Sequence, residues 1–184
     1  MATVLIPLAE GCEELEAVTL IDLLRRAGIT VITASLSGHH QLTASRNVRL
    51  IADTLLDDVI YDDFDMLLMP GGQAGATHLD GDHRIHAMIK RLHHGGNYIA
   101  AICAAPIVLA SSGLLDGRRA TSYPGVLDPQ QWPDIKLSDD PVVIDEKVLT
   151  SRGPGTAMDF ALTIIEVLTD KPTRLKVEAS LVRP

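Results

Sequence analysis

The sequence contains few aromatic residues, only two cysteines, and no long apolar or basic run. Aromatic residues make up 3% of the 184 residues, so the core must be built from aliphatic side chains, which suits a buried parallel sheet with helices on both faces. No cluster of Lys and Arg is interleaved with aromatic residues, and the net charge is −8. These features argue against specific nucleic-acid binding and against anionic membranes. No apolar run is long enough to span a bilayer.

The N-terminal residues are expected to form a first strand and not a signal peptide. Residues 1–8 lack a basic leader and are typical of a first strand, so the sequence predicts a cytoplasmic protein. In that compartment Cys12 and Cys103 are expected to be reduced thiols. The length and the 46% of hydrophobic residues favour one globular domain covering residues 1–184.

Apolar runs alternate with amphipathic stretches along the chain. In the predicted helix 13–27, Val18, Ile21 and Leu24 are expected to face the core. Residues 38–64 are predicted to hold short strands and one helical turn, and residues 120–150 short strands and proline-rich turns. The remaining elements are strands at 3–8, 29–36, 65–69 and 97–102, and helices at 82–94, 104–112 and 159–168. This order predicts an α/β fold with a mainly parallel central sheet and helices on both faces.

Cys103 follows the apolar strand 97–102 directly and precedes a predicted helix. A nucleophile at such a corner lies at the carboxyl end of the sheet, where ligands bind in α/β folds. The N–H groups and positive end of a following helix would favour the thiolate and lower the thiol pKa. The alternative is a buried structural cysteine, because free cysteine is among the most buried residue types.

Four segments together resemble the ThiJ/PfpI superfamily, specifically its parkinsonism-associated deglycase branch with bacterial stress-protective relatives. They are Glu13-Glu14-Leu15-Glu16, Met69-Pro70-Gly71-Gly72, the stretch from Ala100 to Pro106, and the stretch from Thr150 to Thr156. The resemblance implies a flavodoxin-like sandwich that forms homodimers. It also implies that Cys103 is the reactive cysteine and that the Glu16 carboxyl group contacts its sulfur.

The same resemblance implies roles for several further residues. The backbone N–H groups of Gly72 and Ala104 would form an oxyanion pocket, although a turn glycine is the simpler explanation of Gly72. Arg46 and Arg26 match basic residues near the pocket and the dimer contact, with a solvated surface arginine as the alternative. Cys12 lies one turn before Glu16, and we consider it either a resolving thiol or a passive helix-cap residue.

The sequence departs from the family where a histidine is expected. Ala104 stands where many members have a histidine beside the cysteine, and Tyr123 stands where the deglycase branch has one in a later loop. A Cys-His-acid triad, and with it protease activity, is therefore not expected. His83 and His86 lie three residues apart, but no cysteine or carboxylate set completes a metal site with them.

We therefore expect an enzyme of the glyoxalase or deglycase type, a lyase or hydrolase, that protects cells from stress. The Cys103 thiolate would attack methylglyoxal or its adducts on glycated proteins, Glu16 would move protons, and no cofactor or metal would take part. One alternative is a redox sensor or redox-regulated chaperone in which Cys103 is oxidised to the sulfenic or sulfinic acid. A thiamine-related biosynthetic role is the third hypothesis.

Overall fold

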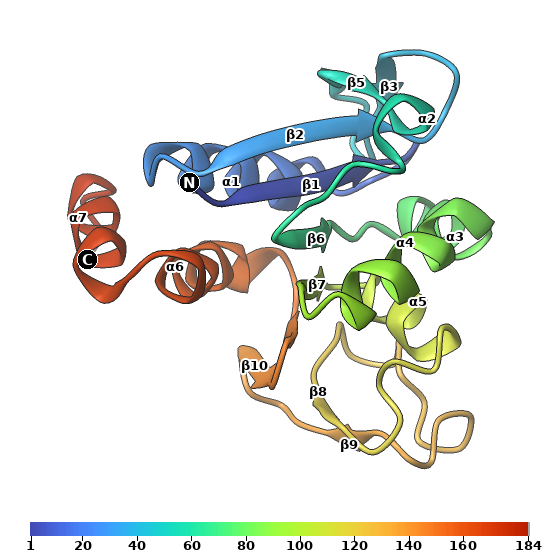
Figure 1. The fold of residues 1–184 in the computed structure, drawn as a ribbon. Helices are drawn as coiled ribbons and strands as arrows, with labels where there is room; N and C mark the ends of the chain where they lie inside the picture. The colour runs from blue at the N-terminus through green and yellow to red at the C-terminus, as the bar shows by residue number, and fades with distance from the viewer. Residues whose placement is uncertain (184) are drawn as a thin grey trace.

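A seven-stranded sheet forms the centre of the molecule (Figure 1). The computed structural model describes residues 1–183. The strand order is β10-β11-β7-β6-β1-β2-β5, and every neighbouring pair is parallel except β10 with β11. The strands are β1 (Thr3–Leu8), β2 (Thr30–Ser35), β5 (Thr54–Leu55), β6 (Met66–Met69), β7 (Tyr98–Ile102), β10 (Val142–Asp145) and β11 (Val148–Ser151).

Two small ribbons extend from the sheet. One is the antiparallel pair β3 (Gln41–Thr43) and β4 (Arg49–Ile51), and the other is the parallel pair β8 (Arg119–Ala120) and β9 (Lys136–Leu137). The first fills the region that the sequence predicts to hold short strands and one helical turn.

Helices cover both faces of the sheet, as the aliphatic composition predicts. Helix α1 (Glu14–Arg26) and helix α6 (Ala157–Leu168) pack on one face, whereas α4 (His83–His94) and α5 (Pro106–Ser111) pack on the other. Along β1, Val4 and Ile6 join the first cluster and Leu5 joins the second, and all three are fully buried. A central parallel strand therefore appears in the sequence as a continuous apolar run, because both of its faces are covered.

The remaining helices are short or peripheral. They are α2 (Leu56–Val59), α3 (Gln73–Asp80), the 3-10 turn η1 (Pro154–Thr156) and α7 (Lys171–Ser180). Helix α7 packs against α6 at the end of the described chain (Figure 1). Among residues 1–183, no helix combines the length and the apolar character needed to cross a bilayer.

The buried face of α1 differs from the expected one. Val18 is 48% exposed, whereas Ala17, Leu20 and Leu24 are fully buried. The expectation for Val18 was therefore wrong. The true inward stripe also contains Glu16, which has no exposed surface, so this helix carries a carboxyl group into the core.

Candidate active site

Cys103 lies at the carboxyl end of β7 in a strained backbone conformation. Its φ angle is +65°, in the left-handed region that non-glycine residues seldom adopt. The Cys103 N–H donates to the Ser151 carbonyl at 2.9 Å, and its own carbonyl accepts from the Tyr123 N–H at 2.8 Å. The two bonds hold the cysteine backbone between β11 and the loop at Tyr123, against a conformational cost of about 1–3 kcal/mol.

Glu16 reaches the same place from the first turns of α1. Its Oε2 accepts a hydrogen bond of 2.8 Å from the Gly71 N–H. Its Oε1 is buried and has no hydrogen-bond partner of standard geometry within the described residues. An ionised carboxylate would leave that oxygen as an unsatisfied buried anion, which is costly.

A glycine turn brings the two side chains together. A Cβ atom on Gly71 would lie 2.7 Å from the Cys103 Cβ and 2.8 Å from the Glu16 Oε2, so both groups lie against the same point of the turn. Gly72 has a φ angle of +87°, which favours glycine. The Glu13 N–H donates to the Gly71 carbonyl at 2.9 Å and ties the turn to the start of α1. Sequence reasoning missed the role of Gly71, although its place in the Pro70-Gly71-Gly72 turn after β6 was a usable signal.

Burial and mutual repulsion prevent Glu16 and Cys103 from being ionised together. Burial raises the pKa of Glu16 to about 7, against smaller opposing effects of the Gly71 N–H and the Cys103 thiol. Burial and the negative charge of Glu16 raise the pKa of the Cys103 thiol to about 12, although the N–H groups of Gly72 and Ala104 act in the opposite direction. Beside an ionised Glu16, the thiol pKa is therefore shifted opposite to the sequence expectation. The pair therefore passes from two protons to one near pH 7 and holds a single proton above that pH.

The expected helix directly after Cys103 starts later than predicted. Residues 103–105 form a turn, and α5 begins at Pro106 and has only six residues. A helix this short, which starts three residues beyond the sulfur, adds little dipole to the site. The polar groups that favour a charged sulfur are instead two single backbone N–H groups, those of Gly72 and Ala104.

Tyr123 is close to Cys103, whereas the two arginines are less closely tied to it. The Tyr123 ring lies against Gly153 and the residue is 51% exposed. Arg46 is exposed, and its N–H donates to Glu14 at 2.8 Å. Arg26 pairs with Asp22 at 2.7 Å near the far end of α1. It lies ten residues beyond Glu16, or about 15 Å along the helix axis, so the structure does not bring it into the pocket.

Cys12 is a buried free thiol beside the glycine turn. It has no exposed surface, and burial, followed by the charge of Glu14, raises its pKa to about 12. A Cβ on Gly75 would lie 2.7 Å from the Cys12 Cα, so α3 packs directly on this residue. Cys12 and Cys103 are not joined by a disulfide.

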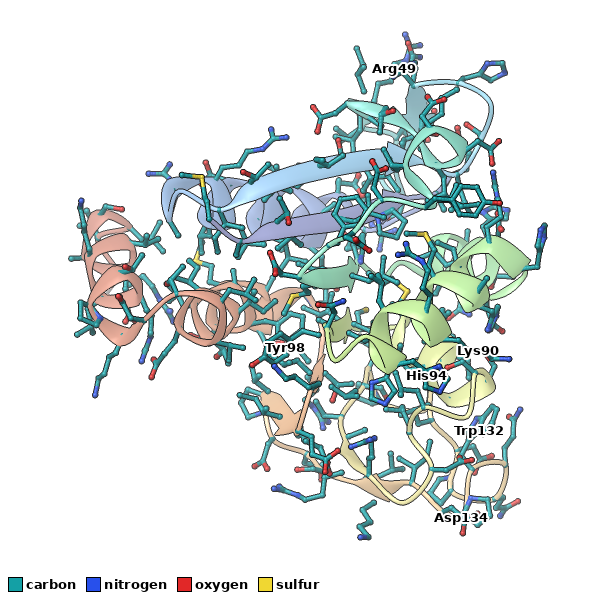
Figure 2. The ribbon with its side chains drawn as sticks, viewed as in Figure 1. Arg49, Lys90, His94, Tyr98, Trp132 and Asp134 are labelled. Carbon is teal, nitrogen blue, oxygen red and sulfur yellow. The ribbon has the colours of Figure 1, made fainter. Side chains whose placement is uncertain are left out.

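The histidines do not contact the cysteine and glutamate pair. Those of α4 include His86, which bonds the Asp80 carbonyl, and His94, which stands with Lys90 on the side of α4 away from the sheet (Figure 2). Within residues 1–183, no group of three or more His, Cys, Asp and Glu side chains is arranged to hold a metal ion.

Comparison with known proteins gives consistent matches across most of the chain. The DJ-1/PfpI family matches residues 2–167. The protein dj-1beta of Drosophila melanogaster is 43% identical over 168 residues, which are 91% of this chain and 89% of that protein. Its crystal structure superposes with a TM-score of 0.95 at 41% identity, covering 100% of this chain and 98% of that one.

Two further relatives carry informative names. A Caenorhabditis elegans protein named glutathione-independent glyoxalase DJR-1.2 is 37% identical over 167 residues, which are 91% of this chain and 88% of the relative. A structure titled Toxoplasma gondii DJ-1, oxidized, has a TM-score of 0.93 at 38% identity and covers 99% of this chain and 98% of its own. The chain therefore belongs to the DJ-1/PfpI family.

Proposed function

We propose that this protein converts reactive dicarbonyls such as methylglyoxal, or their fresh adducts on proteins, into hydroxy acids. The observation that carries the proposal is the buried pair of Cys103 and Glu16, a nucleophile and a proton carrier held against one glycine turn. The name of the Caenorhabditis elegans relative, a glyoxalase that works without glutathione, supports the same chemistry.

The single proton of the pair resides on Glu16 in the proposed resting state. Protonation converts the unpaired Oε1 of Glu16 into a donor that can point at the sulfur. The sulfur in turn has two backbone N–H groups, those of Gly72 and Ala104, which favour its charged form. A carboxylate beside a thiol leaves Oε1 with only the weak S–H donor, whereas a neutral acid beside a thiolate gives the charged sulfur three donors.

The proposed reaction uses this arrangement in three steps. The Cys103 sulfur adds to the aldehyde carbon, and the proton of Glu16 moves to the new alkoxide, which gives a hemithioacetal. The Glu16 carboxylate then removes the hydrogen from that carbon, which gives an enediol, and returns a proton to the neighbouring carbon. The former aldehyde oxygen loses its proton and the former ketone oxygen keeps one, which leaves a hydroxyacyl thioester. Water cleaves the thioester, so methylglyoxal and water yield lactate and the cysteine is regenerated. The N–H groups of Gly72 and Ala104 would stabilise the oxyanions.

Two surface features bear on the proposed partners. Tyr123 offers a half-exposed aromatic ring beside the cysteine backbone, which suits contact with the body of a substrate.

Apolar side chains are exposed on α1 and on the β4 side of the β3–β4 hairpin. The Ser45 hydroxyl donates to Glu14 and so connects these two elements. We propose that this patch forms a homodimer contact, and its members are Leu15, Val18, Val48 and Ile51.

Turnover of methylglyoxal to lactate by the purified protein tests the proposal. We expect Cys103→Ser to abolish turnover and Glu16→Gln to lower kcat by about 100-fold or more, the usual contribution of a positioned acid or base. Cys12→Ala removes the other thiol and is the matched control, for which we expect nearly unchanged turnover. Turnover that survives loss of Cys103 contradicts the proposal.

A redox-sensing role is the second candidate, and one observation favours it. Cys103 is buried but keeps 8% of its surface exposed, and one structural relative is titled as oxidized. Peroxide treatment followed by mass analysis would detect sulfenic or sulfinic acid on Cys103. Rapid oxidation together with an absence of turnover would favour this candidate over the enzyme.

A further inference from the structure

A groove of about 930 Å³ lies apart from the Cys103 site. It is bounded by the carboxyl ends of β1 and β2, by α2, and by the region where α3 ends and α4 begins, which lie on one side of the molecule in Figure 1. Its apolar lining is Ala9, Leu36 and Ile60. His78, on its wall, is six residues beyond Gly72, or about 9 Å along α3. The volume is at the upper end for small-molecule sites.

The side-chain donors of this groove are largely used within the protein. Arg84 donates from all three of its nitrogens, to Asp82, to Asp57 and to the Leu36 carbonyl. The Thr77 hydroxyl donates to the Gln73 carbonyl at 2.9 Å. The Ser37 hydroxyl donates to the His39 carbonyl at 3.2 Å. What remains is one guanidinium hydrogen and the exposed ring of His83.

The acceptors, in contrast, are left open. The Nδ1 of His78 contacts the Glu10 carbonyl at 2.9 Å, and since a carbonyl can only accept, the hydrogen is on Nδ1 and the Nε2 lone pair is free. Glu10 uses one carboxyl oxygen to accept from Thr43, and Asp57 uses one to accept from Arg84. Among the hydrogen bonds of residues 1–183, the second oxygen of each carboxylate has no partner.

The lining also carries a net negative charge, which favours the same kind of ligand as the open acceptors do. The lining contains three acidic residues, Glu10, Asp57 and Asp82, and one arginine, Arg84. A ligand that complements the groove therefore brings hydrogen-bond donors and positive charge at one end and an apolar chain at the other.

We propose that this groove binds a small organic cation, an alkyl chain bearing an ammonium or guanidinium group. The cationic head contacts the free oxygens of Glu10 and Asp57 and the Nε2 of His78, and the chain lies on Leu36 and Ile60. The site is independent of the cysteine chemistry, because neither Cys103 nor Glu16 lines it.

Three six-carbon probes separate charge from apolar contact. Hexylammonium, 1-hexanol and hexanoate are titrated into the isotopically labelled protein at about pH 8, with amide shifts as the readout. We expect saturable shifts from hexylammonium around residues 9–10, 36–37 and 77–84. We expect 1-hexanol to bind about tenfold more weakly and hexanoate not to bind. Equal affinities, or shifts elsewhere in the chain, overturn the proposal.

Charge-removing variants test the assigned residues. Asp57→Asn and Glu10→Gln are each expected to weaken hexylammonium binding about threefold, the usual range for one exposed charge pair. Asp139→Asn, at a side chain that is 98% exposed and outside the groove, is the matched control and should leave the affinity unchanged. Equal weakening by all three variants would mean nonspecific charge attraction and would overturn the site.

Two further measurements close the test. The thermal midpoint of each variant shows whether it is folded, and His78→Gln, which replaces the imidazole acceptor by an amide, is used if Glu10→Gln disturbs the Thr43 contact. A lysine-containing tripeptide is titrated beside hexylammonium. If the tripeptide binds more tightly, the occupant is a protein segment, and the assignment to a small cation is overturned.

Discussion

Replacing Glu16 by glutamine should change how stability depends on pH. The pKa of Glu16 is raised from an ordinary 4.5 to about 7 by burial. A raised carboxyl pKa means that the native state favours the protonated form, so this contribution to stability is full below pH 4.5 and is lost as the pH rises through about 7. At about 1.4 kcal/mol per pKa unit, the loss amounts to at most about 3 kcal/mol.

Glutamine keeps the acceptor for the Gly71 N–H but does not ionise. We therefore expect the stability of Glu16→Gln relative to the wild type to increase by up to about 3 kcal/mol between about pH 4.5 and 7.5. Urea unfolding followed by far-UV circular dichroism at these two pH values measures the change, with the thiol left reduced. Stopping below pH 8 keeps ionisation of the unfolded cysteine out of the comparison.

Glu14→Gln is the matched control from the same helix turn. Although burial acts against it, the pKa of Glu14 is lowered by its own N–H, by the Ser45 hydroxyl and by the Arg46 N–H. Its contribution is present above its ordinary pKa of 4.5 and is lost as the pH falls below that value, so the relative stability of this variant should stay nearly constant between pH 4.5 and 7.5 and rise only below pH 4.5. A difference between Glu16→Gln and wild type that stays constant across the pH range refutes the reasoning.

Three further predictions concern the turn, the surface patch and the substrate. Gly71→Ala should lower stability by about 1–3 kcal/mol and abolish turnover, because the new Cβ would overlap the Cys103 side chain. Gly155→Ala is the control at an open position and should leave stability and turnover unchanged. Ile51→Asp, at a side chain that is 76% exposed, should convert the proposed dimer to a monomer in sedimentation, and a monomeric wild type would refute the patch. Tyr123→Leu should lower kcat/KM for phenylglyoxal more than for methylglyoxal, since only the aryl substrate gains from ring contact, and an unchanged ratio would contradict that role.

The central fold was predictable because its signals are local and strong. Buried strands such as 3–8 and 98–102 are short aliphatic runs, and α4 has a clear apolar stripe. The family resemblance supplied the flavodoxin-like sandwich, whereas the strand order was not predicted, because no local pattern contains it. The fold class and the family are confirmed.

Elements shaped by tertiary contacts were harder to predict. Helix α3 was missed because Gly75 lies in its first turn and lowers helix propensity. A Cβ at this position would strike Cys12, so close packing requires the glycine. Helix α7 was missed because Val177 is its only buried residue, although the Asp170 cap that accepts from the Thr173 N–H at 2.8 Å was a usable signal.

The site also has some features that the sequence predicts and others that depend on tertiary contacts. Residue types and family order indicated Cys103 and Glu16, whereas the Gly71 contact that positions them depends on three segments meeting in space. The expected low thiol pKa depended on a long helix after Cys103, and the actual α5 has six residues. Where the proton of the pair resides is consequently a property of the folded site and not of the local sequence.

Ultraviolet titration of the wild type against Cys103→Ser locates that proton most directly, because a thiolate absorbs near 240 nm and a thiol does not. With the proton on Glu16, we predict a difference absorbance already present at pH 7, together with an infrared band of a protonated carboxyl group that Glu16→Gln removes. A Cys103 sulfur that gains no thiolate absorbance until above about pH 9, the range of an ordinary or buried thiol, would contradict the account.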